Sequence, residues 1–146
     1  MRVRDGMNEI VVTVGPGHTL REAARRMTEA AVGAAVVIDP DHQGPSIVTE
    51  RDLLRSGGRG EDIDIELVRD HLSANLVYAK ADWSLELAAQ QMVENAFRHV
   101  VVLDEAGEVV GILSMRDIVR CWTSEGATSE VPATMGQPLP ASGSGG

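Results

Sequence analysis

The chain of 146 residues contains a single cysteine, Cys121, so no disulfide can form within it and no cysteine cluster can hold a metal ion. Its apolar runs are only a few residues long, too short for a transmembrane helix, and its first residues have no apolar signal core. Lysine and arginine number 13 against 22 aspartate and glutamate, a formal net charge of −9. Such a chain lacks the broad basic face of a protein that binds duplex nucleic acid or a membrane surface. These absences predict a cytoplasmic protein that binds neither.

The sequence also lacks the patterns typical of an enzyme. Its four histidines show no metal-ligand spacing such as His-x-x-x-His, and there is no glycine-rich phosphate loop. Cys121 stands in an apolar helical stretch, where a free thiol is usually a small buried hydrophobe. We therefore expect no catalytic residues and no metal site.

What the sequence does contain is an internal repeat with an offset of 65 residues. Between residues 3 and 55, 17 of 53 positions are identical to the residue 65 positions later, with no gap. A period of this kind indicates a duplicated structural unit. Each copy of about 55 residues is too small to bury a good core alone, so the two copies are expected to pack together.

Each copy shows the same order of expected elements. Short strands are expected at residues 11–14 and 76–79, and Thr19 and Ser84 are expected to cap the helices that follow. Apolar residues at helical spacing mark these helices: Leu20, Ala23, Ala24 and Met27, and Leu85, Ala88, Ala89 and Met92. Strands follow at 34–38, 46–49, 99–103 and 108–114, with second helices starting near Glu50 and Met115. The predicted fold is α/β (α+β): two β-α-β-β-α repeats packed with pseudo-twofold symmetry.

The domain boundaries follow from this order. Residues 1–57 form repeat 1, 58–67 a polar linker, and 68–123 repeat 2. From residue 124 to 146, 12 of 23 residues are Gly, Pro or Ser, so this tail is expected to be disordered.

A short motif occurs in both copies where a strand passes into the second helix. Thr49 and Asp52 in the first copy correspond to Ser114 and Asp117 in the second. A hydroxyl followed three residues later by an acid is typical of a helix capping box. The same arrangement suits a ligand, because a carboxylate accepts hydrogen bonds from a vicinal diol and a helix N-terminus attracts phosphate. Both interpretations are compatible with the sequence.

The duplicated motif and the element order resemble a tandem pair of CBS domains, also called a Bateman module, over about residues 1–123. The resemblance rests on Val3-Arg4-Asp5, the helix from Thr19 to Met27 and the segment Ser46 to Asp52, each with its counterpart 65 residues later. It implies a regulatory module that binds an adenosine-type ligand (AMP, ADP, ATP or S-adenosylmethionine) in clefts between the repeats. It also implies no cofactor other than this ligand, which Mg²⁺ can accompany.

The resemblance assigns roles to individual residues. Asp52 and Asp117 would hold the ribose, and Thr49 and Ser114 would contact phosphate or ribose. Val101, like Val36, stands where the family usually has the proline that frames the adenine, and Ser46 stands where it usually has glycine, which Gly111 retains.

Further candidates flank the motifs. Arg51, Arg116, Arg98 and His99 are candidates for phosphate binding, since arginine pairs with phosphate through two hydrogen bonds; the alternative is that they are surface charges. Gly33 and Ala34 replace Arg98 and His99 in the first copy, so the two clefts should be unequal.

The remaining candidate is Tyr78, which could stack on the base or serve as half-buried packing.

Two functions remain open at this point. The first is a homodimeric ligand sensor that signals to an effector protein, because no effector domain accompanies the repeats. The alternative is a dimeric interaction or adaptor protein whose clefts no longer bind a ligand, which the missing prolines and Ser46 favour.

Overall fold

A computed structural model describes residues 1–41, 44–73 and 78–124 and contains the two expected repeats. The first comprises β1 (Thr13–Val14), α2 (Leu20–Ala30), β2 (Ala34–Val37), β3 (Ser46–Thr49) and α3 (Glu50–Gly58). The second comprises β4 (Tyr78–Lys80), α4 (Leu85–Asn95), β5 (His99–Leu103), β6 (Val109–Ser114) and α5 (Met115–Ser124). Short helical turns precede them, α1 (Val3–Gly6) and η1 (Val68–Asp70). The predicted order of strand, helix, strand, strand, helix is confirmed in both copies.

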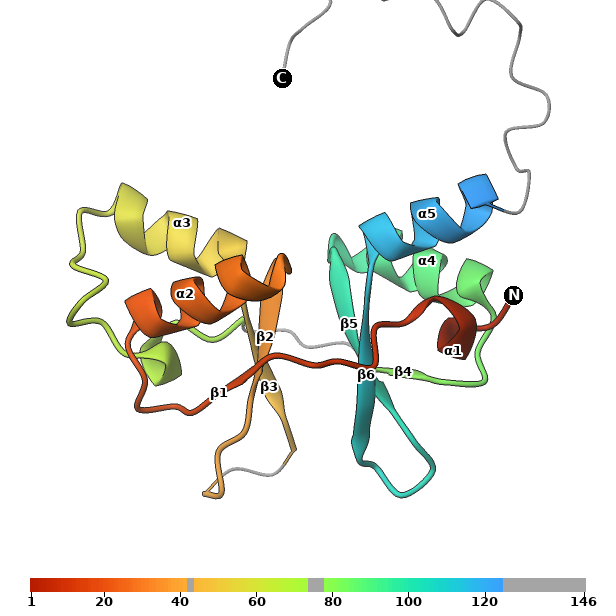
Figure 1. Ribbon diagram of the computed structural model, residues 1–146, viewed down its shortest axis with the longest axis horizontal. Helices are drawn as coiled ribbons and strands as arrows, with labels where there is room; N and C mark the ends of the chain where they lie inside the picture. The colour runs from red at the N-terminus through yellow and green to blue at the C-terminus, as the bar shows by residue number, and fades with distance from the viewer. Residues whose placement is uncertain (42–43, 74–77, 125–146) are drawn as a thin grey trace, which may run out of the picture.

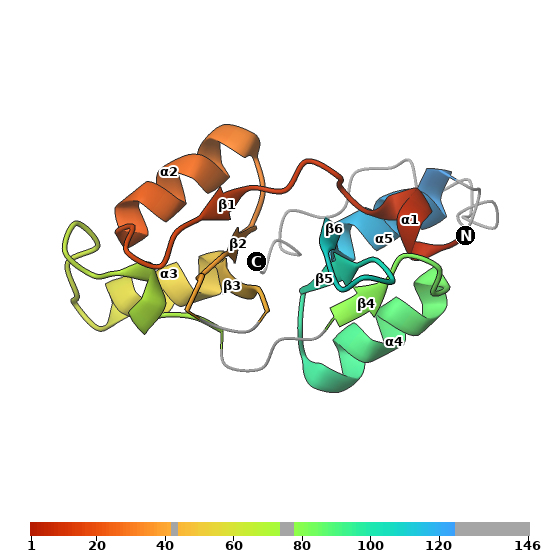
Figure 2. The ribbon, with the colours of Figure 1, turned by 90° about the horizontal axis from the view of Figure 1, so that it is seen from below.

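Each repeat forms a three-stranded mixed sheet. The orders are β1-β2-β3 and β4-β5-β6, and the middle strand is parallel to the first and antiparallel to the third. Figures 1 and 2 show the strands gathered at the centre of the molecule and the helices toward its outer sides. The predicted strands at 46–49 and 99–103 match β3 and β5 residue for residue.

The first strand of each repeat is shorter than predicted. Val11 and Val12 lie outside β1, which retains two residues, and residues 76–77 lie outside the described part of the chain. The predicted disordered tail is also outside it from residue 125 onward.

The predicted helix caps are confirmed. The Thr19 side chain accepts a hydrogen bond from the Glu22 amide at 3.2 Å, and Ser84 accepts one from the Leu87 amide at 3.1 Å. Both helices end in left-handed alanines, Ala31 (φ 55°) and Ala96 (φ 57°), so the first helix ends before Gly33, where the sequence placed its end.

Three apolar clusters hold the molecule together. One lies inside each repeat, between its sheet and its helices. The third lies between the two sheets and joins Ala34, Val36 and Ile47 to Val101 and Ile112. Burial of these apolar side chains is the main term that favours association of the repeats.

The segment that precedes each repeat packs on the other repeat. The Val3 amide donates to the Trp83 carbonyl at 2.8 Å, and the Val68 amide donates to the His18 carbonyl at 2.8 Å. Val3 and Val68 are both fully buried, each in the core of the repeat that it contacts. Separating the repeats would therefore expose both valines. No helix in the described ranges is long and apolar enough to cross a membrane.

Candidate functional site

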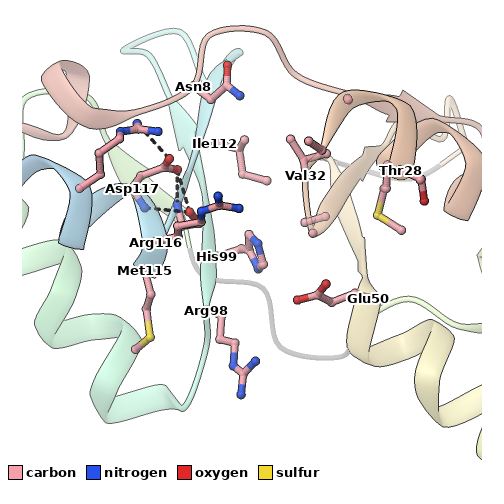
Figure 3. A pocket seen from close by; sticks show the side chains of 17 residues that line it. Asn8, Thr28, Val32, Glu50, Arg98, His99, Ile112, Met115, Arg116 and Asp117 are labelled. Atoms are coloured by element: carbon pink, nitrogen blue, oxygen red, sulfur yellow. Dashed lines mark hydrogen bonds and ion pairs between the residues drawn. The ribbon is translucent and has the colours of Figure 1, made fainter. Parts of the chain in front are cut away.

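A cleft of about 960 Å³ lies between the repeats (Figure 3). The first repeat contributes the C-terminal end of α2, the loop that leads to β2, and Glu50. The second repeat contributes side chains around the start of α5, and the leading segment contributes Asn8. The lining includes five of the ten predicted site residues: Arg98, His99, Ser114, Arg116 and Asp117.

The start of α5 holds Asp117 in the cleft wall. Asp117 Oδ2 accepts hydrogen bonds from the Ser114 amide at 2.9 Å and from Ser114 Oγ at 2.8 Å. Its other oxygen, Oδ1, pairs with Arg120 Nη2 at 3.1 Å. The Arg120 side chain is 65% exposed, so it can leave Oδ1 at little cost. One carboxylate oxygen therefore fixes the helix start, and the other remains available to a ligand.

Cationic groups outnumber carboxylates in this cleft. Arg98, Arg116 and Arg120 line it together with Glu50 and Asp117, although the whole chain carries a net charge of −9. In the part of the chain that the structure describes, Arg98 and Arg116 have no ion-pair partner. Unpaired guanidinium groups around a cleft favour an anionic ligand.

His99 lies at the centre of this charge distribution. Burial lowers the pKa of His99 below its ordinary value of 6.5, while Glu50 and Asp117 oppose that shift and Arg98 adds to it. An anion in the cleft would stabilise the protonated imidazole, because opposite charges attract.

The first motif has a different geometry. Asp52 is only 6% exposed, and its Oδ2 accepts from the Thr49 amide at 2.8 Å, from Thr49 Oγ1 at 3.0 Å and from Ser73 Oγ at 2.7 Å. Ser73 comes from the segment that leads into the second repeat. Three donors on one buried carboxylate oxygen give Asp52 a structural role and cover it.

The equivalent position in the second motif is left open. Asn8 stands 65 residues before Ser73, and their amides make equivalent bonds: Asn8 to the Ile112 carbonyl at 2.8 Å and Ser73 to the Ile47 carbonyl at 3.0 Å. However, the Asn8 side chain accepts from the Ile10 amide at 3.0 Å and lines the cleft. Asp117 therefore lacks the third donor that covers Asp52.

The other predicted site residues lie outside this cleft. Thr49 and Asp52 form the covered motif, and Arg51 on α3 is exposed. Tyr78 is 37% exposed, and its hydroxyl donates to the Pro45 carbonyl at 2.9 Å, which links the two repeats. Val101 is fully buried in the cluster between the sheets.

Sequence analysis missed several residues that line the cleft. Arg120 could have been found from its place three residues after Asp117 on the same helix. Glu50 and Asn8 carry no such local signal, because tertiary packing brings them to the cleft. The same holds for Thr28 and the backbone of residues 30–34.

Comparison with known proteins identifies the family. The CBS domain matches the chain twice, over residues 3–58 and 68–123. The chain belongs to the CBS domain family. Its two copies form a CBS-domain pair.

Individual relatives support this assignment. A CBS domain protein from Pyrobaculum aerophilum complexed with AMP is 30% identical, and the likeness covers 88% of this chain and 99% of that chain with a TM-score of 0.75. The CBS domain-containing protein YhcV of Bacillus subtilis is 34% identical over 119 residues, 80% of this chain and 81% of that protein. An uncharacterised protein of Methanopyrus kandleri is 30% identical over 111 residues, 75% of this chain. The match spans only 57% of that relative's length.

Proposed function

We propose that this CBS-domain pair binds an adenosine nucleotide in the cleft beside Asp117 and signals its presence to a partner protein. The observation that carries the proposal is the asymmetry between the motifs. Asp117 keeps one oxygen available beside three arginines, whereas Asp52 is covered by Ser73. The likeness to a CBS protein complexed with AMP supports adenosine as the ligand class.

The chemistry of the cleft matches the two ends of a nucleotide. Asp117 Oδ1 would accept hydrogen bonds from the ribose hydroxyls once Arg120 turns away. Arg98, Arg116 and Arg120 would neutralise the phosphate, to which arginine pairs with two hydrogen bonds. Because both repeats line the cleft, a bound nucleotide favours the relative arrangement of the repeats that fits it best, which is how occupancy would reach a partner.

Titration calorimetry with AMP, ADP, ATP and S-adenosylmethionine tests this proposal. At least one ligand should bind, and ligand at 100 times its dissociation constant should stabilise the fold by about 2.7 kcal/mol. Asp117→Asn should weaken binding tenfold or more, because a hydrogen bond to a charged group contributes about 1.5–3 kcal/mol and about 1.4 kcal/mol is a factor of ten.

The repeat offers a matched control for each variant. Asp52→Asn and Arg51→Gln change the equivalent residues of the first motif and should leave affinity unchanged, whereas Arg116→Gln should weaken it. If the first-motif variants lose binding and the second-motif variants keep it, the ligand occupies the other side of the molecule. Absence of binding at millimolar concentration of every ligand would contradict the proposal.

The adaptor function remains a second candidate because apolar side chains are exposed on the helices. Leu54 on α3 is 77% exposed and Val119, at the equivalent position on α5, is 56% exposed; Trp122 is 37% exposed. Exposed apolar groups of this kind favour a protein interface, and we propose a homodimer formed through α3 and α5. Light scattering should give twice the chain mass, and Val119→Glu should give a monomer. A wild-type monomer at micromolar concentration would contradict the dimer.

A further inference from the structure

Three potential metal ligands gather in the segment that joins the repeats. Glu61, Glu66 and His71 each bring one ligand atom to within 4.8 Å of the other two. This segment runs from the end of α3 to η1, on the side of the first repeat that is away from the second (Figure 1). The sequence analysis predicted no metal site, because these residues belong to no helix on which their spacing would signal one.

The cluster contains more than acidic groups on a surface. The His71 side chain is only 9% exposed, and its Nε2 lies 2.7 Å from Glu66 Oε1. Glu61 Oε1 is buried and has no hydrogen-bond partner among the described residues. A buried carboxylate oxygen without a donor is unfavourable, and a cation bound between the three side chains would supply its missing partner.

Charge favours a divalent ion over a proton. Two carboxylates at this separation repel each other, and a proton on His71 balances only one of them. A divalent ion would neutralise both and leave His71 as a neutral ligand. The distances are within reach, because ligand atoms around a tetrahedral zinc ion are about 3.4 Å apart. The His71–Glu66 pair has to widen slightly and Glu61 has to approach.

The backbone holds the three residues in place by separate short-range bonds. The Glu61 amide donates to the Ser56 carbonyl at 3.1 Å, the Glu66 amide to Asp62 at 2.9 Å and the His71 amide to Val68 at 3.0 Å. The end of α3, a turn and η1 therefore each present one ligand. A metal bound here would connect these three structures and stabilise the segment that carries buried Val68 and the donor Ser73.

We propose that Glu61, Glu66 and His71 form a binding site for one divalent transition-metal ion, separate from the nucleotide cleft. An imidazole combined with two carboxylates suits zinc and similar ions better than Mg²⁺ or Ca²⁺, which take oxygen ligands. The second repeat offers no equivalent ligands at the matching positions, which are Met1 and Gly6. One ion per chain is therefore expected.

Calorimetry with ZnCl₂ on protein purified without a histidine tag tests the site. One Zn²⁺ should bind per chain and raise the melting temperature by several degrees, whereas MgCl₂ should do neither. Glu61→Gln and His71→Gln should each weaken Zn²⁺ binding tenfold or more. The matched control is Glu105→Gln, an exposed carboxylate outside the cluster, which should leave binding unchanged. Failure to bind at millimolar Zn²⁺, or equal affinity in Glu61→Gln and wild type, would overturn the proposal.

A second measurement covers the case in which a variant does not fold. In the wild-type protein, Zn²⁺ should shift the ¹⁵N signal of His71 Nε2 and leave that of His18 in place. An unshifted His71 signal at saturating Zn²⁺ would overturn the proposal without any substitution. The nucleotide titrations can be repeated in the presence of a chelator, so the two proposals succeed or fail independently.

Discussion

Alanine in place of each motif aspartate should have different effects on stability, although Asp52 and Asp117 are equivalent in the repeat. Asp52 is 6% exposed and accepts three hydrogen bonds on Oδ2, one of them from Ser73. Asp52→Ala leaves buried donors without an acceptor, and unmade bonds to a charged group cost about 1.5–3 kcal/mol each before relaxation. Since the two hydroxyl groups can rotate toward other acceptors, we expect a net loss of about 3 kcal/mol.

Asp117→Ala should cost much less. The Asp117 side chain is 15% exposed, and the two Ser114 donors lie at the cleft wall, where water can replace the carboxylate. The expected loss is that of a helix cap, about 1 kcal/mol. Its pair with exposed Arg120 adds little.

Urea unfolding followed by circular dichroism measures both values. The midpoint should fall further for Asp52→Ala, with an unchanged slope, because the slope follows the surface exposed on unfolding. Ser73→Ala in wild type and in Asp52→Ala completes a double-mutant cycle, which should return a coupling of about 1 kcal/mol for the pair. Equal losses for the two aspartates, or a greater loss for Asp117→Ala, would refute the argument that Ser73 covers the first motif.

Three further outcomes are expected. Because the folded pKa of His99 lies below 6.5, the unfolded chain takes up a proton that the folded chain does not. The free energy of unfolding should therefore fall from about pH 7 to about pH 5, and His99→Gln should flatten this part of the urea-unfolding profile. A Cβ at Gly6 would lie 2.8 Å from Cys121 Sγ, so Gly6→Ala should cost about 1–3 kcal/mol; in the double variant with Cys121→Ala the combined loss should be smaller than the sum, and strict additivity would contradict the contact. Ala96 has φ 57°, so Ala96→Gly should raise stability by up to about 1 kcal/mol, whereas Ala106→Gly should not; a lower melting temperature for Ala96→Gly would count against a strained helix end.

Much of the fold could be predicted because it depends on local pattern repeated twice. The helix caps Thr19 and Ser84 and the strand from His99 to Leu103 were predicted correctly, since a capping hydroxyl and an apolar run act over a few residues. The first strands were overestimated: β1 keeps only Thr13 and Val14, each paired with β2. How far the apolar run from Val11 remains paired depends on its neighbour strand, which local sequence does not specify.

The candidate site divides along the same line. Arg98, His99, Ser114, Arg116 and Asp117 are close in sequence to one motif, and the structure brings all five to one cleft. Residues supplied by other elements were missed, because their positions follow from packing between the repeats.

The sequence by itself determined that this protein is a doubled unit, with a hydroxyl and an acid at the start of a helix in each half. Only the tertiary structure decided that the halves differ in use. The leading segments cross between the repeats, so that Ser73 covers Asp52 while Asn8 leaves Asp117 accessible. The physical reason is that the Ser73–Asp52 contact joins residues 21 positions apart, and its geometry depends on burial of Val68 in the first core and Val3 in the second.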